Sequence, residues 1–324
     1  MVKQNSNDPI KKLKDDASKF FQLGIKEDES GHFKNALKLY QKSLSIKKDF
    51  GPYVLIGRIY FYEFGDFLKA SKILEKAVRF KSMFTLPKEK SCTFWTLLGS
   101  CYRELGQYKK AERFYKKALS YKKTVEALVF LGVVYRQLRK YDQSNACFKK
   151  AIKIEPKFSE SHLNLGINYA QLEKFDLAKE HIEKSIRLDK QCEIGYCELA
   201  YANLDQENLN DAERNFRKAI QLKPSLYALQ GLGIVLIQKK QFPEAIQVLR
   251  RSLLYVPDEE EMFSYLYLAY AYDQANKAAQ AKREYKKAIE LFPKEAIVYR
   301  SYGKFLSSRN NTKAEYYLKK AAKL

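Results

Sequence analysis

The chain has 324 residues, and its 60 Lys and Arg against 38 Asp and Glu give a formal net charge of +22. Its 13 Gly and 8 Pro are too few for long flexible linkers. No apolar run approaches the ~20 residues that a helix needs to span a bilayer, and no secretory leader is visible. The composition therefore speaks against a membrane-spanning or secreted chain, and we expect a cytoplasmic protein.

Residues 1–16 are polar, and we expect them to form an N-terminal tail. From residue 17 onward one pattern recurs, and it is clearest at Trp95, Leu98 and Gly99, followed by Ala111 and Tyr115. The small residue late in each unit returns every 33 to 36 residues, at Ala118, Ala151, Ser185, Ala219, Ser252, Ala288 and Ala321.

Each residue type in this pattern has a physical reason. Trp95, Leu98 and Tyr102 follow the 3.6-residue period, so they form the apolar stripe of a first helix, helix A. Gly99 lies on that stripe and lets a second helix, helix B, approach closely. Gly106 suits the left-handed residue that ends helix A. Proline cannot continue a helix, and it follows helix B in several units, at Pro156, Pro224, Pro257 and Pro293.

A period near 34 with Trp-x2-Leu-Gly-x2-Tyr, then Ala, an aromatic residue and Pro, resembles the tetratricopeptide repeat (TPR). The resemblance covers residues 17–324 and implies an all-α fold, a single right-handed α-solenoid of about nine helix-turn-helix units. Two units depart from the pattern, because Glu27 and Asn203 stand where an aromatic residue belongs. The expected units are 17–49, 50–82, 92–124, 125–158, 159–192, 193–225, 226–259, 262–295 and 296–324.

The repeat period is interrupted once, at residues 83–91. The sequence separation of Ala77 and Ala118 there exceeds the period by about seven residues. We expect an insertion there, made of a lengthened helix B and a loop.

No catalytic, cofactor-binding or metal site is expected. The sequence has five Cys without a C-x2-C pair, and neither a Gly-rich phosphate loop nor a nucleophile elbow. His162 occupies the position of Trp95 in its own unit, and we expect it to pack between helices. A metal site built from His162, His181 and a neighbouring Cys is an alternative that no ligand spacing supports. The chain is therefore predicted not to be an enzyme.

The first candidate surface is a groove. The resemblance implies that helices A line a concave face with positions 2, 5, 6, 9, 12 and 13 of each unit. In units six to eight these positions are largely apolar or aromatic, and an exposed apolar groove binds protein by default. In the alternative, adjacent helices A bury the stripe against each other. The predicted partner-binding residues are Asn164, Tyr201, Tyr227, Ile234, Phe263, Tyr267 and Tyr270.

The polar type of TPR groove, which clamps a C-terminal carboxylate, is not expected. That clamp requires Lys, Asn and Arg at fixed groove positions of three consecutive units, and only Asn164 matches.

The second candidate surface is basic. Positions 25 and 26 of helix B are doubly basic in six units, which would form a row attractive to acidic proteins, nucleic acid or an anionic membrane surface. In the alternative, these are solvated side chains of a Lys-rich chain. The twelve residues are Lys116, Lys117, Lys149, Lys150, Arg217, Lys218, Arg250, Arg251, Lys286, Lys287, Lys319 and Lys320.

The last helix, near 312–324, carries Tyr317, Leu318 and Leu324, and no further helix follows. Repeat arrays normally end in a polar cap. This end therefore predicts either docking to a partner or self-association, or a helix that frays.

Together these features favour a non-catalytic scaffold or adaptor that holds a polypeptide segment in the aromatic groove, within a larger assembly. The alternative is a nucleic-acid- or RNA-associated protein that uses the basic helix-B face.

Overall fold

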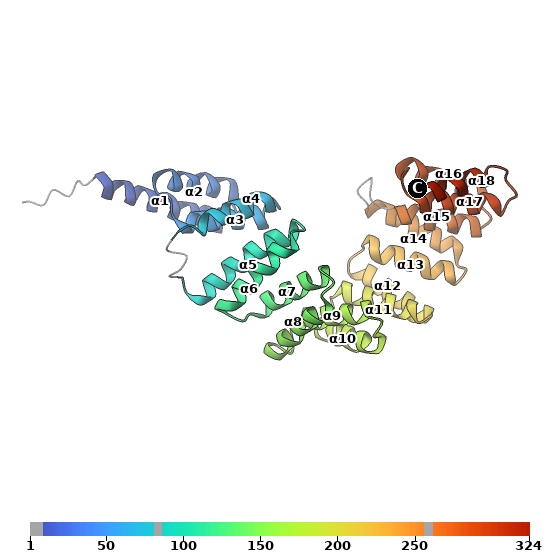
Figure 1. Ribbon diagram of the computed structural model, residues 1–324, viewed down its shortest axis with the longest axis horizontal. Coiled ribbons are helices and arrows are strands. Elements are labelled where there is room, and N and C mark those ends of the chain that lie inside the picture. Colours follow the sequence, from blue (N-terminus) through green and yellow to red (C-terminus); the bar gives the residue numbers. More distant parts are fainter. Residues whose placement is uncertain (1–8, 81–85, 256–261) are drawn as a thin grey trace, which may run out of the picture. The chain divides into compact units, whose positions relative to one another are not determined.

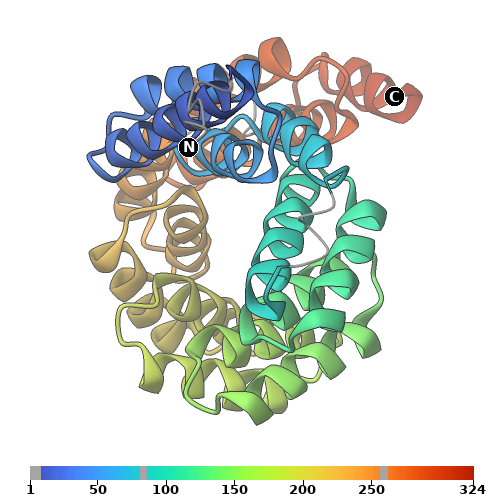
Figure 2. The same ribbon diagram turned by 90° about the vertical axis from the view of Figure 1, so that its left-hand side faces the viewer.

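The structure is a computed structural model that describes residues 9–80, 86–255 and 262–324, with side chains from Lys14 onward. The described residues form 18 α-helices and one short 3₁₀ helix, with no strand among them. Figures 1 and 2 show that the helices follow one another as antiparallel pairs. Among the helices described, none is both long and apolar enough to cross a membrane.

The nine pairs correspond to the nine predicted repeats, and in each pair the first helix is helix A and the second is helix B. They are α1 (Pro9–Glu29) and α2 (Phe33–Ile46); α3 (Phe50–Tyr62) and α4 (Phe67–Ala77); α5 (Lys88–Glu104) and α6 (Tyr108–Tyr121); α7 (Val125–Gln137) and α8 (Tyr141–Ile154); α9 (Ser159–Gln171) and α10 (Phe175–Leu188); α11 (Glu193–Asp205) and α12 (Leu209–Leu222); α13 (Leu226–Gln238) and α14 (Phe242–Ser252), followed by η2 (Leu253–Tyr255); α15 (Met262–Gln274) and α16 (Ala278–Leu291); and α17 (Ala296–Ser307) and α18 (Ala314–Lys323).

The chain divides into two compact parts, here called the N-terminal segment (1–164) and the C-terminal segment (165–324). Within each segment helix B of one repeat also packs on helix A of the next, as α6 does on α7 and α12 on α13. Each repeat therefore buries its apolar face against its neighbours, as a solenoid requires. The predicted all-α repeat fold is confirmed.

The residues of the recurring pattern form the core. Trp95, Leu98 and Ala118 are at most 1% exposed. Helix A and helix B approach closely at the glycine of helix A: a Cβ atom at Gly132 would lie 2.5 Å from Phe148 Cε1, and one at Gly99 would lie 2.9 Å from Tyr115. Phe148 and Tyr115 are fully buried, so neither ring has room to move aside.

Two expectations about the N-terminal segment are wrong. Residues 9–16, expected to belong to a polar tail, form the start of α1, which begins at Pro9. Proline is favoured at a first helical position because its missing N–H needs no partner there. Helix α1 is held to α2 directly after this stretch, because the Ser43 hydroxyl donates to the Ala17 carbonyl at 2.8 Å. The remaining part of the predicted tail, 1–8, lies outside the described residues.

Helix B before the insertion is not lengthened. Helix α4 ends at Ala77, and the chain then turns so that Phe80 stacks on Tyr53 with ring centroids 5.6 Å apart. It is helix A of the next repeat that is extended, because α5 begins at Lys88 and places Ser91 and Cys92 in the core. Part of the predicted insertion, 83–85, lies outside the described residues.

Each turn between helix A and helix B contains a residue with positive φ, between 51° and 78°. Glycine fills this place in the first three repeats, at Gly31, Gly65 and Gly106. The next six repeats place a residue with a side chain there, and for such residues the left-handed conformation costs roughly 1–2 kcal/mol, less for Asn. They are Arg139, Glu173, Glu207, Lys240, Asn276 and Asn310.

Replacing such a residue by glycine is expected to stabilise the fold. Glu173→Gly relieves the left-handed strain but makes the unfolded chain more flexible, so the net gain is about 0.5–1 kcal/mol. Thermal unfolding followed by circular dichroism measures it. Asn276→Gly is the matched comparison and should gain less, because Asn tolerates this conformation. A loss of stability in Glu173→Gly would contradict the strain in this turn.

Candidate binding groove

Helices A of the C-terminal segment carry an exposed apolar row. At position 2 of the repeat the side chain is 39–49% exposed in four successive repeats. Repeats three to five have polar residues at this position, Thr93, Glu126 and Glu160. The change from polar to apolar coincides with the change from α9 to α11. We call these four residues the apolar row: Ile194, Tyr227, Phe263 and Ile297.

Tyr201 supports the apolar row from the side. Its ring stacks on Tyr227 with centroids 4.4 Å apart and meets Phe216 edge-on at 4.9 Å. Its hydroxyl donates to the Tyr227 carbonyl at 3.1 Å. Burial, with the charge of Glu198 nearby, holds the pKa of Tyr227 well above its usual range. Tyr227 therefore remains a neutral hydroxyl-bearing ring at all physiological pH values, and 46% of it is exposed.

A hollow of about 420 Å³ lies on the same helices, between α13 and α15. Position 9 follows position 2 by two helical turns, so the hollow and the apolar row share one stripe of helix A. The predicted residues Ile234, Tyr267 and Tyr270 all line the hollow. Its full lining is Ile234, Ile237, Gln238, Lys240, Phe242, Tyr267, Tyr270 and Gln274. The apolar row and this hollow together form the candidate groove.

Six of the seven predicted groove residues are thus on one stripe of the C-terminal segment. The alternative, that helices A bury the stripe against each other, holds for part of the stripe. Cys197 and Leu266 at position 5 are 2% and 7% exposed, and Tyr201 at position 9 is half-buried against Tyr227, whereas Tyr270 at position 9 is 44% exposed. The prediction missed Phe242, because it considered helix A alone and Phe242 is the first residue of helix B.

The seventh residue, Asn164, belongs to the N-terminal segment and is buried. Its side-chain oxygen accepts from Arg136 Nη2 at 2.9 Å, and its side-chain nitrogen donates to the Glu160 carbonyl at 2.9 Å. Both ends of the amide therefore have partners within the chain. A ligand that used Asn164 would have to displace Arg136.

The basic pairs of helix B have a structural use. In three of the six pairs the second Lys covers the face of the aromatic residue at position 4 of its own repeat. Lys117 lies 3.8 Å from the centroid of Trp95, Lys320 lies 4.4 Å from that of Tyr299, and Lys287 lies 4.9 Å from that of Tyr265. Such cation–π contacts stabilise a partly desolvated cation by about 0.5–2 kcal/mol.

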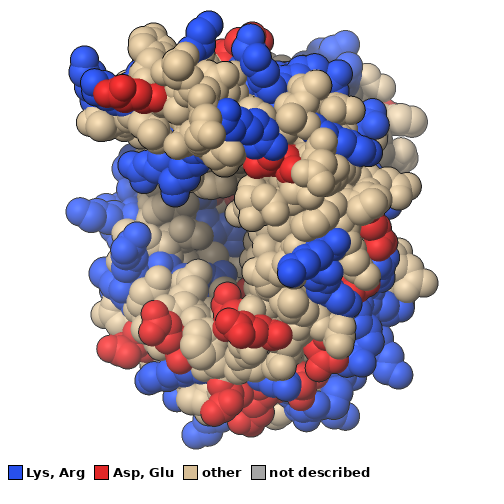
Figure 3. Space-filling view, turned by 90° about the vertical axis from the view of Figure 1, so that its right-hand side faces the viewer, with Lys and Arg blue, Asp and Glu red and all other residues tan. Residues whose placement is uncertain are grey.

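The first residue of the pair is often in an ion pair. Lys116 pairs with Glu112 at 2.6 Å, and Arg217 pairs with Glu213 and Glu244 at 2.7 and 2.8 Å. On the face that Figure 3 shows, Lys and Arg are scattered among uncharged and acidic side chains rather than gathered in one block. These contacts favour the alternative that much of the basic row belongs to the fold.

The two members of one pair should therefore differ in their effect on stability. Lys117→Gln removes the cation 3.8 Å from the centroid of Trp95 and should cost about 1 kcal/mol. Lys116→Gln removes the ion pair with Glu112 and a longer contact, 5.7 Å, to the Tyr135 ring, and should cost less, at most ~0.5 kcal/mol. Trp95 is the chain's one Trp, so its fluorescence reports unfolding directly. Equal losses in the two variants would show that the cation–π contact contributes little.

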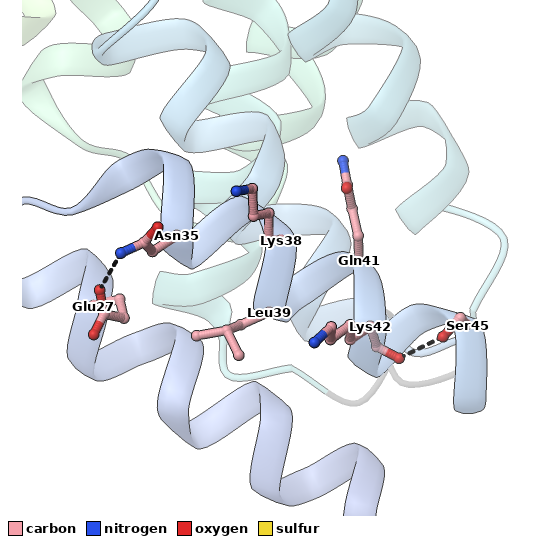
Figure 4. A pocket seen from close by; sticks show the side chains of 7 residues that line it. All are labelled: Glu27, Asn35, Lys38, Leu39, Gln41, Lys42 and Ser45. Carbon is pink, nitrogen blue, oxygen red and sulfur yellow. Dashed lines mark hydrogen bonds between the residues drawn. The ribbon is translucent and has the colours of Figure 1, made fainter.

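A second hollow, of about 640 Å³, lies on α1 and α2 (Figure 4). It is an open surface depression rather than a cleft, and its polar groups partly satisfy one another. Asn35 donates to Glu27 at 3.1 Å, and Ser45 donates to the Lys42 carbonyl at 2.7 Å. It brings together no set of groups that could carry out catalysis. The lining residues are Glu27, Asn35, Lys38, Leu39, Gln41, Lys42 and Ser45.

Two of the three His and four of the five Cys residues are used in packing, whereas His32 is exposed and Cys192 is half-buried. His162 is buried as predicted, with Nε2 3.1 Å from the Pro156 carbonyl, and His181 stacks on Tyr169. Across residues 9–80, 86–255 and 262–324, no three His, Cys, Asp or Glu side chains are grouped so that they could hold a metal ion. Burial raises the pKa of the Cys101 and Cys197 thiols to about 12.

These thiols should be inert in the folded protein. At pH 8 a thiol with a pKa near 12 has roughly three orders of magnitude less thiolate than one with the usual value of 8.5. Half-buried Cys192 should react first with iodoacetamide, and Cys101 and Cys197 only after unfolding in guanidinium. Peptide mass spectrometry of the alkylated protein identifies the order. Labelling of Cys101 as fast as Cys192 in the native protein would contradict the close packing around α5.

Comparison with known proteins agrees with this architecture. Five family models described as tetratricopeptide repeat match residues 93–124, 125–158, 159–192, 203–266 and 263–295. Together they cover 93–192 and 203–295, which is more than half of the chain. A search of the curated proteins finds no match.

Solved structures with the same fold share little sequence. The chain superposes on pilF of Pseudomonas aeruginosa with a TM-score of 0.60 at 15% identity, covering 68% of this chain and 99% of that one. A tetratricopeptide repeat protein of Parabacteroides merdae gives 0.59 at 16% identity, covering 78% and 96%. The APC/C hetero-tetramer Cut9–Hcn1 gives 0.50 at 14% identity, covering 94% and 96%. At these identities the likeness concerns the fold alone.

Proposed function

Because the chain belongs to the tetratricopeptide-repeat family, whose members generally mediate protein–protein interactions, we propose that it is a cytoplasmic, non-catalytic scaffold or adaptor. It holds a polypeptide segment in the candidate groove of α11, α13 and α15, and it does so within a larger assembly. The observation that carries the proposal is the apolar row, with the hollow of Tyr267 and Tyr270 beside it.

The chemistry of the groove suits a polypeptide. Tyr227, Phe263 and Tyr270 each leave 44–46% of their surface exposed, on one stripe of the two adjacent helices α13 and α15. Large aromatic side chains with few rotatable bonds lose little entropy on binding, and they dominate the energetics of protein interfaces. The backbone groups of a helix are already paired along it, so the contact must be made by side chains. An amphipathic helix or an extended segment with apolar anchors fits this surface.

Support also comes from the fold of a protein that works in an assembly. A chain of the APC/C hetero-tetramer Cut9–Hcn1, whose fold matches over 94% of this sequence, is solved as part of that assembly. The proposed absence of catalysis rests on the family, and on the burial of His162, Cys101 and Cys197 in the described parts of the chain. The alternative of a nucleic-acid-binding helix-B face is weakened, because Lys117, Lys287 and Lys320 each cover an aromatic ring.

The test compares two pairs of exposed aromatic residues. Phe263→Ser with Tyr270→Ser removes two anchors of the groove, and the expected result is at least a tenfold loss of the captured partner. The tagged protein is used to pull partners from an extract of its native cells, and quantitative mass spectrometry compares it with the double variant.

The matched control is Tyr62→Ser with Tyr316→Ser, two residues that are 66% and 62% exposed and lie outside the groove. It should retain the partners. Circular dichroism must show equal helicity in all three proteins. Identical partner sets for the groove variant and the unsubstituted protein would exclude the groove as the binding surface.

A further inference from the structure

The stripe that carries the groove changes its chemistry at α17. At position 9 the residues are Tyr201, Ile234 and Tyr270 on α11, α13 and α15, and then Lys304 on α17. At position 5 the series of uncharged residues likewise ends at Arg300. The apolar row itself continues onto α17, because Ile297 at position 2 is 39% exposed. Helix α17 therefore adds two cations at positions 5 and 9, which carry uncharged residues on α11, α13 and α15.

Arg300 and Lys304 are separated by one helical turn, so their side chains lie on the same face of α17. Both are exposed. Within the described parts of the chain, neither forms an ion pair or a hydrogen bond. The nearby acid, Asp273 at the end of α15, is already paired with Arg309. The two cations are thus available to an anion from outside.

These cations and the aromatic anchors lie on adjacent helices A. Helix α17 packs on α15, which carries Phe263, Tyr267 and Tyr270. Packed helix axes are separated by about 8–10 Å, so a ligand lying across the helices passes from apolar anchors to cations within a few of its own residues.

The opposite end of the groove carries the opposite charge. Glu198 on α11 lies beside Tyr227, and its negative charge contributes to the raised pKa of the Tyr227 hydroxyl. An acidic group of a ligand is repelled at α11 and attracted at α17. The charges at the two ends of the groove therefore favour one orientation of a bound acidic segment over the reverse orientation.

We propose that the segment held in the groove is acidic as well as apolar. Its apolar side chains contact Tyr227, Phe263 and Tyr270, and at least one Asp or Glu side chain binds Arg300 and Lys304. This inference rests on the proposed function and specifies the chemistry of the partner. Carboxylate–guanidinium contacts contribute specificity and orientation more than affinity, because both cations are exposed to solvent.

The test uses a phage library of random 16-residue peptides selected on the immobilised protein. Enriched peptides should combine aromatic or aliphatic residues with Asp or Glu, above their frequency in the unselected library. The variant Arg300→Glu with Lys304→Glu should instead enrich Lys and Arg. A fluorescent peptide selected on the unsubstituted protein should bind this variant at least tenfold more weakly, and its affinity should depend less on salt.

The matched control is Lys282→Glu with Lys286→Glu on α16, an exposed pair with the same spacing and the same change in net charge. It should change the affinity less than twofold. Equal weakening by both charge reversals, or enriched peptides without an excess of Asp and Glu, would overturn the inference. Arg300→Gln with Lys304→Gln, which adds no repulsion, should still weaken binding several-fold.

The two proposals fail separately. If Phe263→Ser with Tyr270→Ser abolishes binding of the selected peptides but Arg300→Glu with Lys304→Glu does not, only the acidic ligand is excluded. If no peptide is enriched, or none depends on Phe263 and Tyr270, the groove itself is not a polypeptide site and both proposals fall.

Discussion

The close approach of helix A to helix B at one small residue is the constraint on which the rest of the structure depends. A glycine of helix A faces a bulky side chain of helix B, as Gly132 faces Phe148 and Gly233 faces Leu249, with no space for even a Cβ atom. Because the contact recurs in repeat after repeat, one pattern of residues specifies most of the helix pairing. The same contact buries one face of each helix in the pair. Any function must be carried by the residues between the pattern positions, and in the C-terminal segment these form an apolar stripe that ends in two cations.

The fold could be predicted almost completely from the sequence, because the pattern residues are the packing residues. Trp95, Leu98 and Ala118 are buried for the same reason that they recur. The predicted helix boundaries were wrong where the repeat pattern stops. Nothing in the 34-residue period indicates that α1 begins as early as Pro9, or that the extra residues before Trp95 lengthen helix A rather than helix B.

The candidate groove could be predicted in part. Tyr227, Phe263 and Tyr270 follow from the groove positions that the family resemblance implies, and helical spacing confirms only that these positions form one stripe. Contacts between a side chain and another element do not follow from spacing. That is why the burial of Asn164 under Arg136, the contribution of Phe242 and the position of Lys117 over Trp95 required coordinates. The paired Lys and Arg residues in the sequence suggested a binding surface on helix B. In the structure, many of these side chains instead contact aromatic or acidic residues of the protein itself.

The turns between helix A and helix B are expected to make the local stability of the repeats differ between the two segments. In a solenoid each repeat is held only by its neighbours, so the least stable repeats open first. The N-terminal segment has glycine in three of its left-handed turns, while the turns of the C-terminal segment, from Glu173 to Asn310, have none. A ligand that lies across α11, α13, α15 and α17 joins four of the strained repeats. In the proposed function such a ligand connects these repeats, so that its binding would also stabilise them against local opening.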